Sequence, residues 1–241
     1  MIDIHNHILP GLDDGVGSWD EALTLCELAS MDGIKGLVAT PHIREGIYPN
    51  SRDEIMDSLH ELRTRLSNRI DIKIYSGAEV HIAMDLVEKI NRNEIMSINE
   101  EGYLLLELPE HLLPPRTEDL LFNLKLAKIT PIIAHPERCS WAVSEFNRLE
   151  KFIEDGALVQ ITAMSLTGGF GKAVRSVAKK LLKLSLVDVI ASDSHSAGHR
   201  PPKLSGALEA AVKIVGEEAA EKLVKENPQR IIDGKQIEGR G

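Results

Sequence analysis

The residues best suited to chemistry in this chain are histidines that stand in short motifs with acidic neighbours. Five of the nine histidines belong to such motifs. The motifs are Asp3-Ile4-His5-Asn6-His7, Thr40-Pro41-His42, His135-Pro136-Glu137-Arg138 and Ser192-Asp193-Ser194-His195. Imidazole and carboxylate groups together are ligands for Zn, Mn or Fe, and several such clusters in one chain indicate a multinuclear metal site. The pattern therefore predicts a metal-dependent hydrolase.

Further carboxylates extend this set of candidates. Glu79 and Glu107 each end an otherwise apolar run. A carboxylate in that position is costly to bury unpaired, and a metal ion would satisfy it; a helix cap or a salt bridge is the alternative explanation. Asp13 and Asp14 lie close to the first histidine pair. We expect one of them to be a ligand and the other a turn residue, with Asp14 as the ligand.

Structural explanations stay open for several of these residues. His42 and His135 are single histidines, which in isolation are more often structural, and Ser192–His195 could be a polar turn. We favour ligands because both histidines adjoin a proline at the end of a predicted strand. The other histidines lack such settings and are treated as non-ligands: His60, His81, His111 and His199.

The segments that must position these residues alternate between strand-like and helix-like patterns. Short apolar runs predict strands at Met1–Ile4, Gly36–Ala39, Ile70–Ser76, Tyr103–Leu108, Thr130–Ala134, Leu158–Ala163 and Val187–Ala191. Apolar residues at helical spacing predict helices at Ser18–Met31, Ser51–Leu66, Thr117–Lys128, Glu145–Asp155, Gly171–Leu184, Lys203–Val215 and Glu217–Glu226. Ser18, followed by Glu21, is a candidate N-cap with a capping box. This alternation favours a closed parallel barrel over an open sheet.

Every candidate ligand falls at the carboxyl end of a predicted strand or just after it. In parallel β/α barrels that face contains the active site. His5 and His7 are two residues apart and therefore point to the same side of an extended chain, and Asp193 and His195 repeat the arrangement. A dinucleotide fold is disfavoured, because the glycines of Gly168-Gly169-Phe170-Gly171 have the wrong spacing for the nucleotide-binding fingerprint.

Length and composition favour a single domain. The chain has 241 residues, of which 43% are apolar and only 4% aromatic, so aliphatic side chains must form most of the core. A net charge of -9 without a basic stripe argues against nucleic acid as a partner. We expect a cytoplasmic protein without membrane insertion, since two cysteines give no disulfide framework and neither a secretory signal nor a membrane-spanning run is visible. The expected domain is 1–236, and 237–241 read like a remnant of a protease site.

Seven motifs in a fixed order give the chain a family resemblance. They are Asp-x-His-x-His, Pro-Gly-Leu-Asp-Asp-Gly, Thr-Pro-His, Gly-Ala-Glu, Glu-Leu-Pro, His-Pro-Glu-Arg and Ser-Asp-Ser-His. From Met1 to about Pro228 the chain resembles the PHP (polymerase and histidinol phosphatase) superfamily. More closely, it resembles the manganese-dependent bacterial protein-tyrosine phosphatases encoded with capsule and exopolysaccharide genes. The resemblance implies a distorted (β/α)7 TIM-like barrel, the PHP fold, with three divalent metal ions at its mouth.

The resemblance also implies how the ligands are shared. Matched motif by motif, one ion would be held by His5, His7, Glu79 and Asp193, a second by Glu79, Glu107 and His135, and a third by Asp14, His42 and His195. Mn²⁺ is the expected ion. Fe, Zn or Mg are alternatives, because this ligand set suits several metals.

Arginines are expected to bind the phosphate, since a planar guanidinium matches its oxygens. Arg138 directly follows a ligand motif, and Arg200 follows the last ligand by five residues, where the family also has an arginine. The alternatives are a salt bridge to a neighbouring strand for Arg138 and an exposed loop position for Arg200. Asp3 is expected to orient an imidazole of the first motif.

These inferences predict a phosphatase acting on phosphotyrosine in proteins, with the tail of a bacterial tyrosine kinase that controls capsule or exopolysaccharide synthesis as substrate. The alternative is a small-molecule phosphatase of the superfamily, such as one for histidinol phosphate. A nuclease module fits less well because the chain is acidic and has no basic stripe. A non-catalytic scaffold fits less well because it would not need the complete ligand set. Cysteine-based phosphotyrosine hydrolysis needs an arginine six positions after a cysteine, and those positions hold Asp32 after Cys26 and Glu145 after Cys139.

Overall fold

The computed structural model describes residues 1–67 and 69–237, so Glu238–Gly241, most of the expected tail, lie outside the described residues. Within these described residues, all pairs of neighbouring strands are parallel. The strands are β1 (Ile2–Asn6), β2 (Gly36–Ala39), β3 (His42–Ile43), β4 (Lys73–Ser76), β5 (Glu79–His81), β6 (Tyr103–Glu107), β7 (Thr130–Ala134), β8 (Leu158–Thr162) and β9 (Val189–Ala191).

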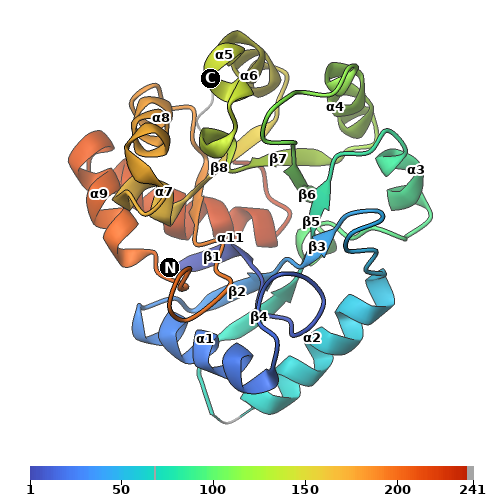
Figure 1. The fold of residues 1–241 in the computed structure, drawn as a ribbon, viewed down its shortest axis with the longest axis vertical. Coiled ribbons are helices and arrows are strands. Elements are labelled where there is room, and N and C mark those ends of the chain that lie inside the picture. Colours follow the sequence, from blue (N-terminus) through green and yellow to red (C-terminus); the bar gives the residue numbers. More distant parts are fainter. Residues whose placement is uncertain (68, 238–241) are drawn as a thin grey trace.

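Helices surround these strands, as Figure 1 shows. The α-helices are α1 (Trp19–Met31), α2 (Arg52–Leu66), α3 (Leu86–Asn91), α4 (Thr117–Leu126), α5 (Trp141–Ser144), α6 (Phe146–Glu154), α7 (Ala163–Thr167), α8 (Gly171–Lys183), α9 (Ser205–Val215), α10 (Glu217–Glu221) and α11 (Asn227–Ile232). Two 3₁₀ turns, η1 (Ile98–Glu100) and η2 (Pro136–Arg138), and one π-helical turn, η3 (Lys222–Glu226), complete the set. No described helix is long and apolar enough to cross a membrane.

Local sequence explains where the first two helices begin. The Ser18 side chain accepts a hydrogen bond from the backbone N–H of Glu21 at the start of α1. The Glu21 carboxylate accepts from Gly17 rather than from Ser18, so the predicted capping box is only half formed. At α2 the reciprocal box is complete, between Ser51 and Glu54. Such a cap satisfies backbone N–H groups that have no partner within the helix.

The predicted α/β fold with parallel strands is confirmed, but over the described residues the strands form two sheets and not one closed barrel. One sheet has the order β1-β2-β4 and the other the order β3-β5-β6-β7-β8-β9. The division falls where β2 passes through Thr40-Pro41 into β3 and β4 passes through Gly77-Ala78 into β5. Proline has no N–H to donate to a ladder, which interrupts the pairing at this point.

The edges of the two sheets meet beside the last strand. Asn6, at the end of β1, forms an isolated parallel bridge with Ser194, just after β9. Two backbone hydrogen bonds support this contact, from Asp193 N–H to the His5 carbonyl and from His7 N–H to the Ser194 carbonyl, each 2.8 Å. The first and last ligand motifs are therefore neighbours in space.

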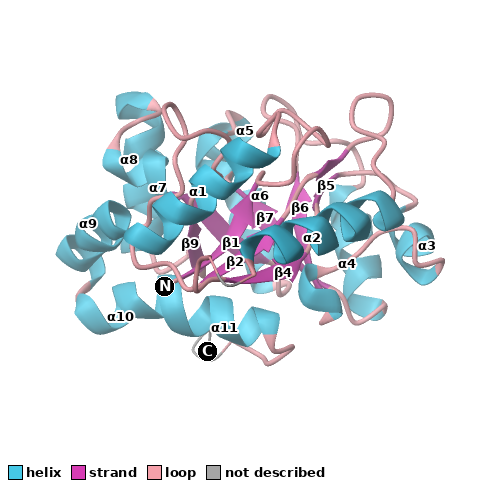
Figure 2. Ribbon diagram, turned by 90° about the horizontal axis from the view of Figure 1, so that it is seen from below, coloured by secondary structure: helices cyan, strands magenta, loops and turns pink. Residues whose placement is uncertain are grey.

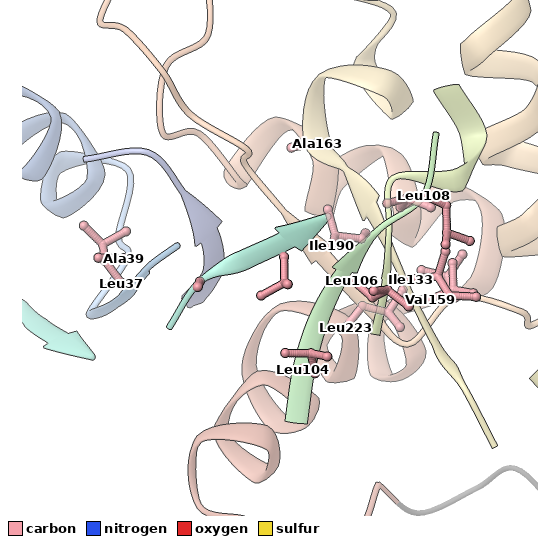
Figure 3. Packing of buried hydrophobic residues seen from close by; sticks show 14 of the residues in the cluster. Leu37, Ala39, Leu104, Leu106, Leu108, Ile133, Val159, Ala163, Ile190 and Leu223 are labelled. Atoms are coloured by element: carbon pink, nitrogen blue, oxygen red, sulfur yellow. The ribbon is translucent and has the colours of Figure 1, made fainter. Parts of the chain in front are cut away.

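Both faces of the central strands are apolar, as expected for parallel strands covered on both sides. Side chains alternate along β6, so that Leu104 and Leu106 join a large cluster beneath the outer helices, whereas Tyr103 and Leu105 join a smaller one. Figure 3 shows part of the large cluster, with Leu104, Leu106 and Ile190 among its labelled members.

The smaller cluster also includes residues of η1 and α11. Figure 2 shows α10 and α11 across one end of the strands. Tyr103, the first residue of β6, donates its hydroxyl hydrogen to the carbonyl of Lys235, just after α11. The amino ends of the strands are thereby covered, and the carboxyl ends are left for the candidate site.

Candidate metal centre

The structure brings all nine predicted ligands together at the carboxyl ends of the strands. They fall into four groups whose ligand atoms lie within 4.8 Å of one another: His7, Asp14, His42 and His195; His5, His7 and Asp193; His5, Glu79 and His135; His42, Glu79 and Glu107. Each residue stands in a strand, at a strand end or in the loop that follows. Parallel strands that end on one side explain why motifs distant in sequence converge.

The two histidines of the first motif show most directly what the cluster can bind. His5 Nδ1 lies 2.9 Å from the side-chain oxygen of Gln160, and His7 Nδ1 lies 2.7 Å from Asp13 Oδ2. Since an oxygen acceptor fixes the ring proton on Nδ1, the Nε2 atom of each neutral ring is left with a lone pair. These two Nε2 atoms are 3.2 Å apart.

Two buried carboxylates face the same point. Glu79 Oε2 lies 3.0 Å from His5 Nε2 and 3.3 Å from His7 Nε2. Asp193 Oδ1 lies 3.4 and 3.5 Å from the same two nitrogens. Four electron-pair donors therefore converge in a buried space, with no proton between the neutral rings. This donor set fits a divalent cation.

Glu79 stands at the middle of the whole cluster. Its Oε1 atom lies 2.9 Å from His135 Nε2, while its Oε2 atom also lies 3.2 Å from His42 Nδ1. A carboxylate whose two oxygens face different histidines could contribute one oxygen to each of two ions. Glu107 groups with His42 and Glu79 and not with His135, so the partners that the resemblance implied for Glu107 differ in part from the observed ones.

The geometry distinguishes between the two candidate aspartates. Asp14 Oδ1 lies 3.5 Å from His42 Nε2 and 3.4 Å from His195 Nε2, as a shared ligand would. Asp13 instead accepts hydrogen bonds from the His7 ring and from the backbone N–H groups of Gly15 and His42. Asp13 therefore acts both as a turn residue and as the group that orients His7.

Two ligands have a backbone conformation that side chains rarely adopt. His135 has φ 35° and Asp193 has φ 53°, both in the left-handed region. Such conformations cost free energy outside glycine, and they persist where the surrounding structure fixes them, often at functional sites. Both residues lie just after a strand, β7 for His135 and β9 for Asp193, and their side chains reach the cluster.

The carboxylates are stabilised in their charged form. Burial by itself would raise the pKa of Asp193, but His5, His7 and Arg200 outweigh it and hold this pKa well below the usual range. Burial would likewise raise the pKa of Glu79, yet the surrounding histidines lower it well below its ordinary value. Charged oxygens are what a cation site requires.

The pKa values of two histidines in the cluster are also shifted. Burial works to lower the pKa of His7, but hydrogen bonds to Asp13, Asp193 and Glu79 raise it well above its ordinary value. A proton on this ring takes the place that a metal ion would occupy among the same carboxylates. Burial lowers the pKa of His195, which favours the neutral form that binds metal.

Both predicted arginines reach the cluster through Asp193. Arg138 Nη1 donates to Asp193 Oδ2 at 2.5 Å, and Arg200 also forms an ion pair with Oδ2. Because Oδ1 faces His5 and His7, the two oxygens of this carboxylate are directed at different partners. Arg138 and Arg200 also line the cavity above the ligands, which makes them available to an anion there.

That cavity has a volume of about 250 Å³ and is lined mostly by polar and charged side chains. Its wall includes residues that sequence reasoning missed: Arg44, Ile47, Tyr48 and Glu110. The Tyr48 ring stacks on His42 at 5.5 Å between centroids. Alternation could have indicated Arg44, because it follows His42 by two residues and so points to the same side.

The role predicted for Asp3 is not the observed one. Within the described residues no imidazole nitrogen hydrogen-bonds to the Asp3 carboxylate, which accepts instead from the backbone N–H and the hydroxyl of Ser192 and from the backbone N–H of His5. Burial raises the pKa of Asp3 to about 6. The group that orients His5 is Gln160, which lies 155 positions away in the sequence and gave no local signal.

The histidines treated as non-ligands are absent from all four groups. One of them still supports the site, because His81 Nδ1 lies 3.0 Å from Glu107 Oε2. The buried Glu137 carboxylate accepts from Thr162 N–H and from the Ser165 hydroxyl, which fixes the turn η2 that contains Arg138.

Both cysteines are buried free thiols. Burial raises the pKa of each thiol to about 12, so neither is a thiolate near neutral pH. The nucleophile of cysteine-based phosphotyrosine hydrolysis is a thiolate. The surroundings of Cys26 and Cys139 agree with the sequence argument against that route.

Comparison with known proteins identifies the family and the relatives of this chain. The family described as "Capsular polysaccharide synthesis, CpsB/CapC" matches residues 1–233. The chain is 40% identical over 202 residues to the putative tyrosine-protein phosphatase CapC of Staphylococcus aureus, covering 83% of this chain and 79% of that protein. It is 33% identical over 219 residues to the tyrosine-protein phosphatase YwqE of Bacillus subtilis (strain 168), covering 90% and 86%.

A solved structure agrees with the sequence comparison. It belongs to a study of YwqE from Bacillus subtilis and CpsB from Streptococcus pneumoniae, described as unique metal-dependent tyrosine phosphatases. The match has a TM-score of 0.95 at 32% identity and covers 99% of this chain and 96% of the solved one. The resemblance read from the seven motifs is thus confirmed, and the chain belongs to the CpsB/CapC family of capsular polysaccharide synthesis.

Proposed function

We propose that this protein is a metal-dependent phosphatase that hydrolyses phosphotyrosine in proteins. The observation that supports this most strongly is the convergence of the lone pairs of His5 and His7 with the carboxylates of Glu79 and Asp193. With both rings neutral and protonated on Nδ1, these four groups present only electron pairs to one another, and a divalent cation would bind them all. The tyrosine-protein phosphatases named among the relatives support the same activity.

Nine residues would hold the metal ions, and we propose three ions with Mn²⁺ as the expected one. The ligands would be His5, His7, Asp14, His42, Glu79, Glu107, His135, Asp193 and His195. Glu79 supports a multinuclear centre, because its two oxygens face different histidines. Fe, Zn or Mg remain chemically compatible with the ligand set.

When bound, divalent ions neutralise the phosphoryl oxygens and lower the pKa of water, which supplies a nucleophile at neutral pH. The four ligand carboxylates contribute a charge of about -4 and three divalent ions would contribute about +6, so the loaded site would be locally cationic. This local balance is compatible with a dianionic substrate despite the net charge of -9.

Arg138 and Arg200 would bind and orient the phosphate. Each guanidinium reaches Asp193 Oδ2 and also lines the cavity, so donors not used by Asp193 can meet phosphoryl oxygens. Arginine offers several N–H donors in a planar fork, which suits that task. They would stabilise the charge that develops on the phosphoryl group during hydrolysis.

The expected partner is a bacterial tyrosine kinase that controls capsule or exopolysaccharide synthesis, whose phosphorylated tail would be the substrate. The family's link to capsular polysaccharide synthesis supports this choice. Small-molecule phosphatase activity, for example on histidinol phosphate, is the alternative within the wider superfamily.

Hydrolysis rates for two substrates would separate these activities. The Mn²⁺-loaded protein should release phosphate from a phosphotyrosine peptide with a far higher kcat/KM than from histidinol phosphate. A preference for histidinol phosphate would overturn the proposed substrate class, and hydrolysis of neither would overturn the phosphatase assignment.

A further inference from the structure

A glycine-rich turn between α7 and α8 has no part in the metal centre, yet it reaches the same region. Gly168 and Gly171 have φ 101° and φ 89°, in the left-handed region that favours glycine. A Cβ atom on Gly169 would lie 2.6 Å from Met164 Cε, so the end of that flexible side chain would have to shift. Gly168 and Gly171 permit a tight turn, and the residue that the turn presents is Phe170.

Phe170 lies against both candidate phosphate-binding arginines. The guanidinium carbon of Arg138 is 5.0 Å from the centroid of the Phe170 ring, and that of Arg200 is 5.8 Å away. Both distances are within the range of about 6 Å in which a cation is attracted to an aromatic face. The two arginines come from different elements, η2 and the loop after β9, so the ring joins parts of the site that are distant in sequence.

The same two guanidinium groups also meet at one carboxylate oxygen. Arg138 and Arg200 both contact Asp193 Oδ2, and their two positive charges exceed the single negative charge of that carboxylate. The negative potential of an aromatic face offsets part of the remaining repulsion. The half-buried Phe170 ring also restricts two long side chains that would otherwise adopt many rotamers.

We infer that Phe170 is a positioning residue that holds Arg138 and Arg200, through a shared cation–π contact, in the orientation that binds the phosphate. The inference rests on the proposed phosphatase function. It also explains the Gly168–Gly171 motif, which has the wrong spacing for a nucleotide but places an aromatic ring beside two arginines.

The test compares substitutions that separate ring chemistry from packing. Phe170→Leu keeps an apolar side chain but removes the aromatic face, whereas Phe170→Tyr keeps the face. With metal content held equal, kcat/KM for a phosphotyrosine peptide should fall about 5- to 30-fold in Phe170→Leu. Phe170→Tyr should stay close to wild type, and the affinity for inorganic phosphate, measured by calorimetry, should follow the same order.

A matched control is available on α6. Phe146 lies under Lys180, whose Nζ is 3.4 Å from the ring centroid. Phe146→Leu is therefore the same substitution at another cation–π contact, and it changes no contact of Arg138 or Arg200. It should leave phosphate affinity and kcat/KM unchanged.

A second comparison asks whether Phe170 acts through the arginines. Residues that act as a unit have non-additive effects. Phe170→Leu should therefore cost much less phosphate affinity in an Arg138→Ala, Arg200→Ala background than in the wild type. An equal loss in both backgrounds, or equal losses in Phe170→Leu and Phe170→Tyr, would assign the effect to packing and overturn the inference.

The two proposals fail in different ways. A wild-type protein that does not hydrolyse phosphotyrosine would contradict the proposed function, while calorimetry with inorganic phosphate would still test the positioning role. An active wild type with an unimpaired Phe170→Leu variant would contradict the positioning role alone.

Discussion

The role of a side chain in this site depends on which partner binds its second polar atom. His5 and His7 are chemically identical, and each offers Nε2 to the cluster because Gln160 or Asp13 occupies Nδ1. Asp193 divides its two oxygens between histidines and arginines. Predictions about residues can therefore separate loss of metal from loss of substrate contacts.

Removal of a ligand should reduce metal content and turnover together. His135→Ala removes the nitrogen that faces Glu79 Oε1. Substitution of a residue that orients a metal ligand typically lowers metal affinity or activity about 10–100-fold. Substitution of a direct ligand should lower both further. His60→Ala, which removes an exposed histidine on α2, is the matched control. Elemental analysis with kinetics tests this, and an active His135→Ala protein with full metal content would remove His135 from the site.

Loss of an arginine should instead leave the metals in place. Arg138→Ala and Arg200→Ala should each lower turnover about 10²–10³-fold, because a charged donor to the phosphoryl group is lost. Lysine should rescue only in part, since a point charge cannot reproduce the bidentate fork. We expect the larger loss at Arg138, which follows a ligand motif directly. Arg92→Ala, which removes an exposed ion pair with Glu88 at the end of α3, serves as control. If both variants match wild type at equal metal content, the metals alone bind phosphate.

The cysteines should be dispensable. With both thiol pKa values raised to about 12 by burial, Cys26 and Cys139 stay protonated in any assay near neutral pH. The Cys26→Ser, Cys139→Ser double variant should keep most of its activity, and the native protein should resist alkylation by iodoacetamide. A modest loss is compatible with Cys139 adjoining Arg138. A metal-loaded but inactive double variant would demand a cysteine mechanism.

At the scale of elements, the sequence predicted the strands and helices whose bounds follow from a local pattern of apolar residues. The strands at Gly36–Ala39 and Thr130–Ala134 have the predicted bounds, because they are apolar runs buried on both faces. β3 and β5 were missed, since two and three residues are too few to show a periodicity. The predicted helix Glu217–Glu226 is divided into α10 and the π-helical turn η3, and α11 follows directly.

The loop after β1 offers a test at this scale. Gly15 lies so close to His7 that a Cβ atom would be 2.2 Å from its carbonyl oxygen and 2.6 Å from its Cβ. Gly15→Ala should displace the loop that holds Asp13 and Asp14, lower metal content and activity, and cost about 1–3 kcal/mol of stability.

Gly17 in the same loop provides the control for that substitution. A Cβ atom there would be 3.7 Å from the Glu21 side chain, an ordinary contact. Gly17→Ala should bind metal and unfold like the wild type. Equal metal content in Gly15→Ala and Gly17→Ala, measured beside their melting temperatures, would show that the close approach to His7 does not position the ligands.

At the scale of the whole molecule, long-range geometry set the limits of prediction. The ligands could be predicted because parallel strands bring their carboxyl ends to one side. Alternation placed Asp3 on the same face as His5 but could not identify its partner, which is the Ser192 hydroxyl. Gln160 and the division into two sheets depend on contacts between distant segments, which no local spacing reveals.

The central claim is that this whole arrangement exists to bind metal for phosphotyrosine hydrolysis. Its most direct test is phosphate release from a phosphotyrosine peptide by protein that has been exhaustively chelated and then reconstituted. The stripped protein should be inactive and should melt at a lower temperature, because bound ions stabilise the native state. Added Mn²⁺ should restore both activity and melting temperature, and should restore activity better than Mg²⁺. Full activity in protein shown by elemental analysis to contain no metal would contradict the account.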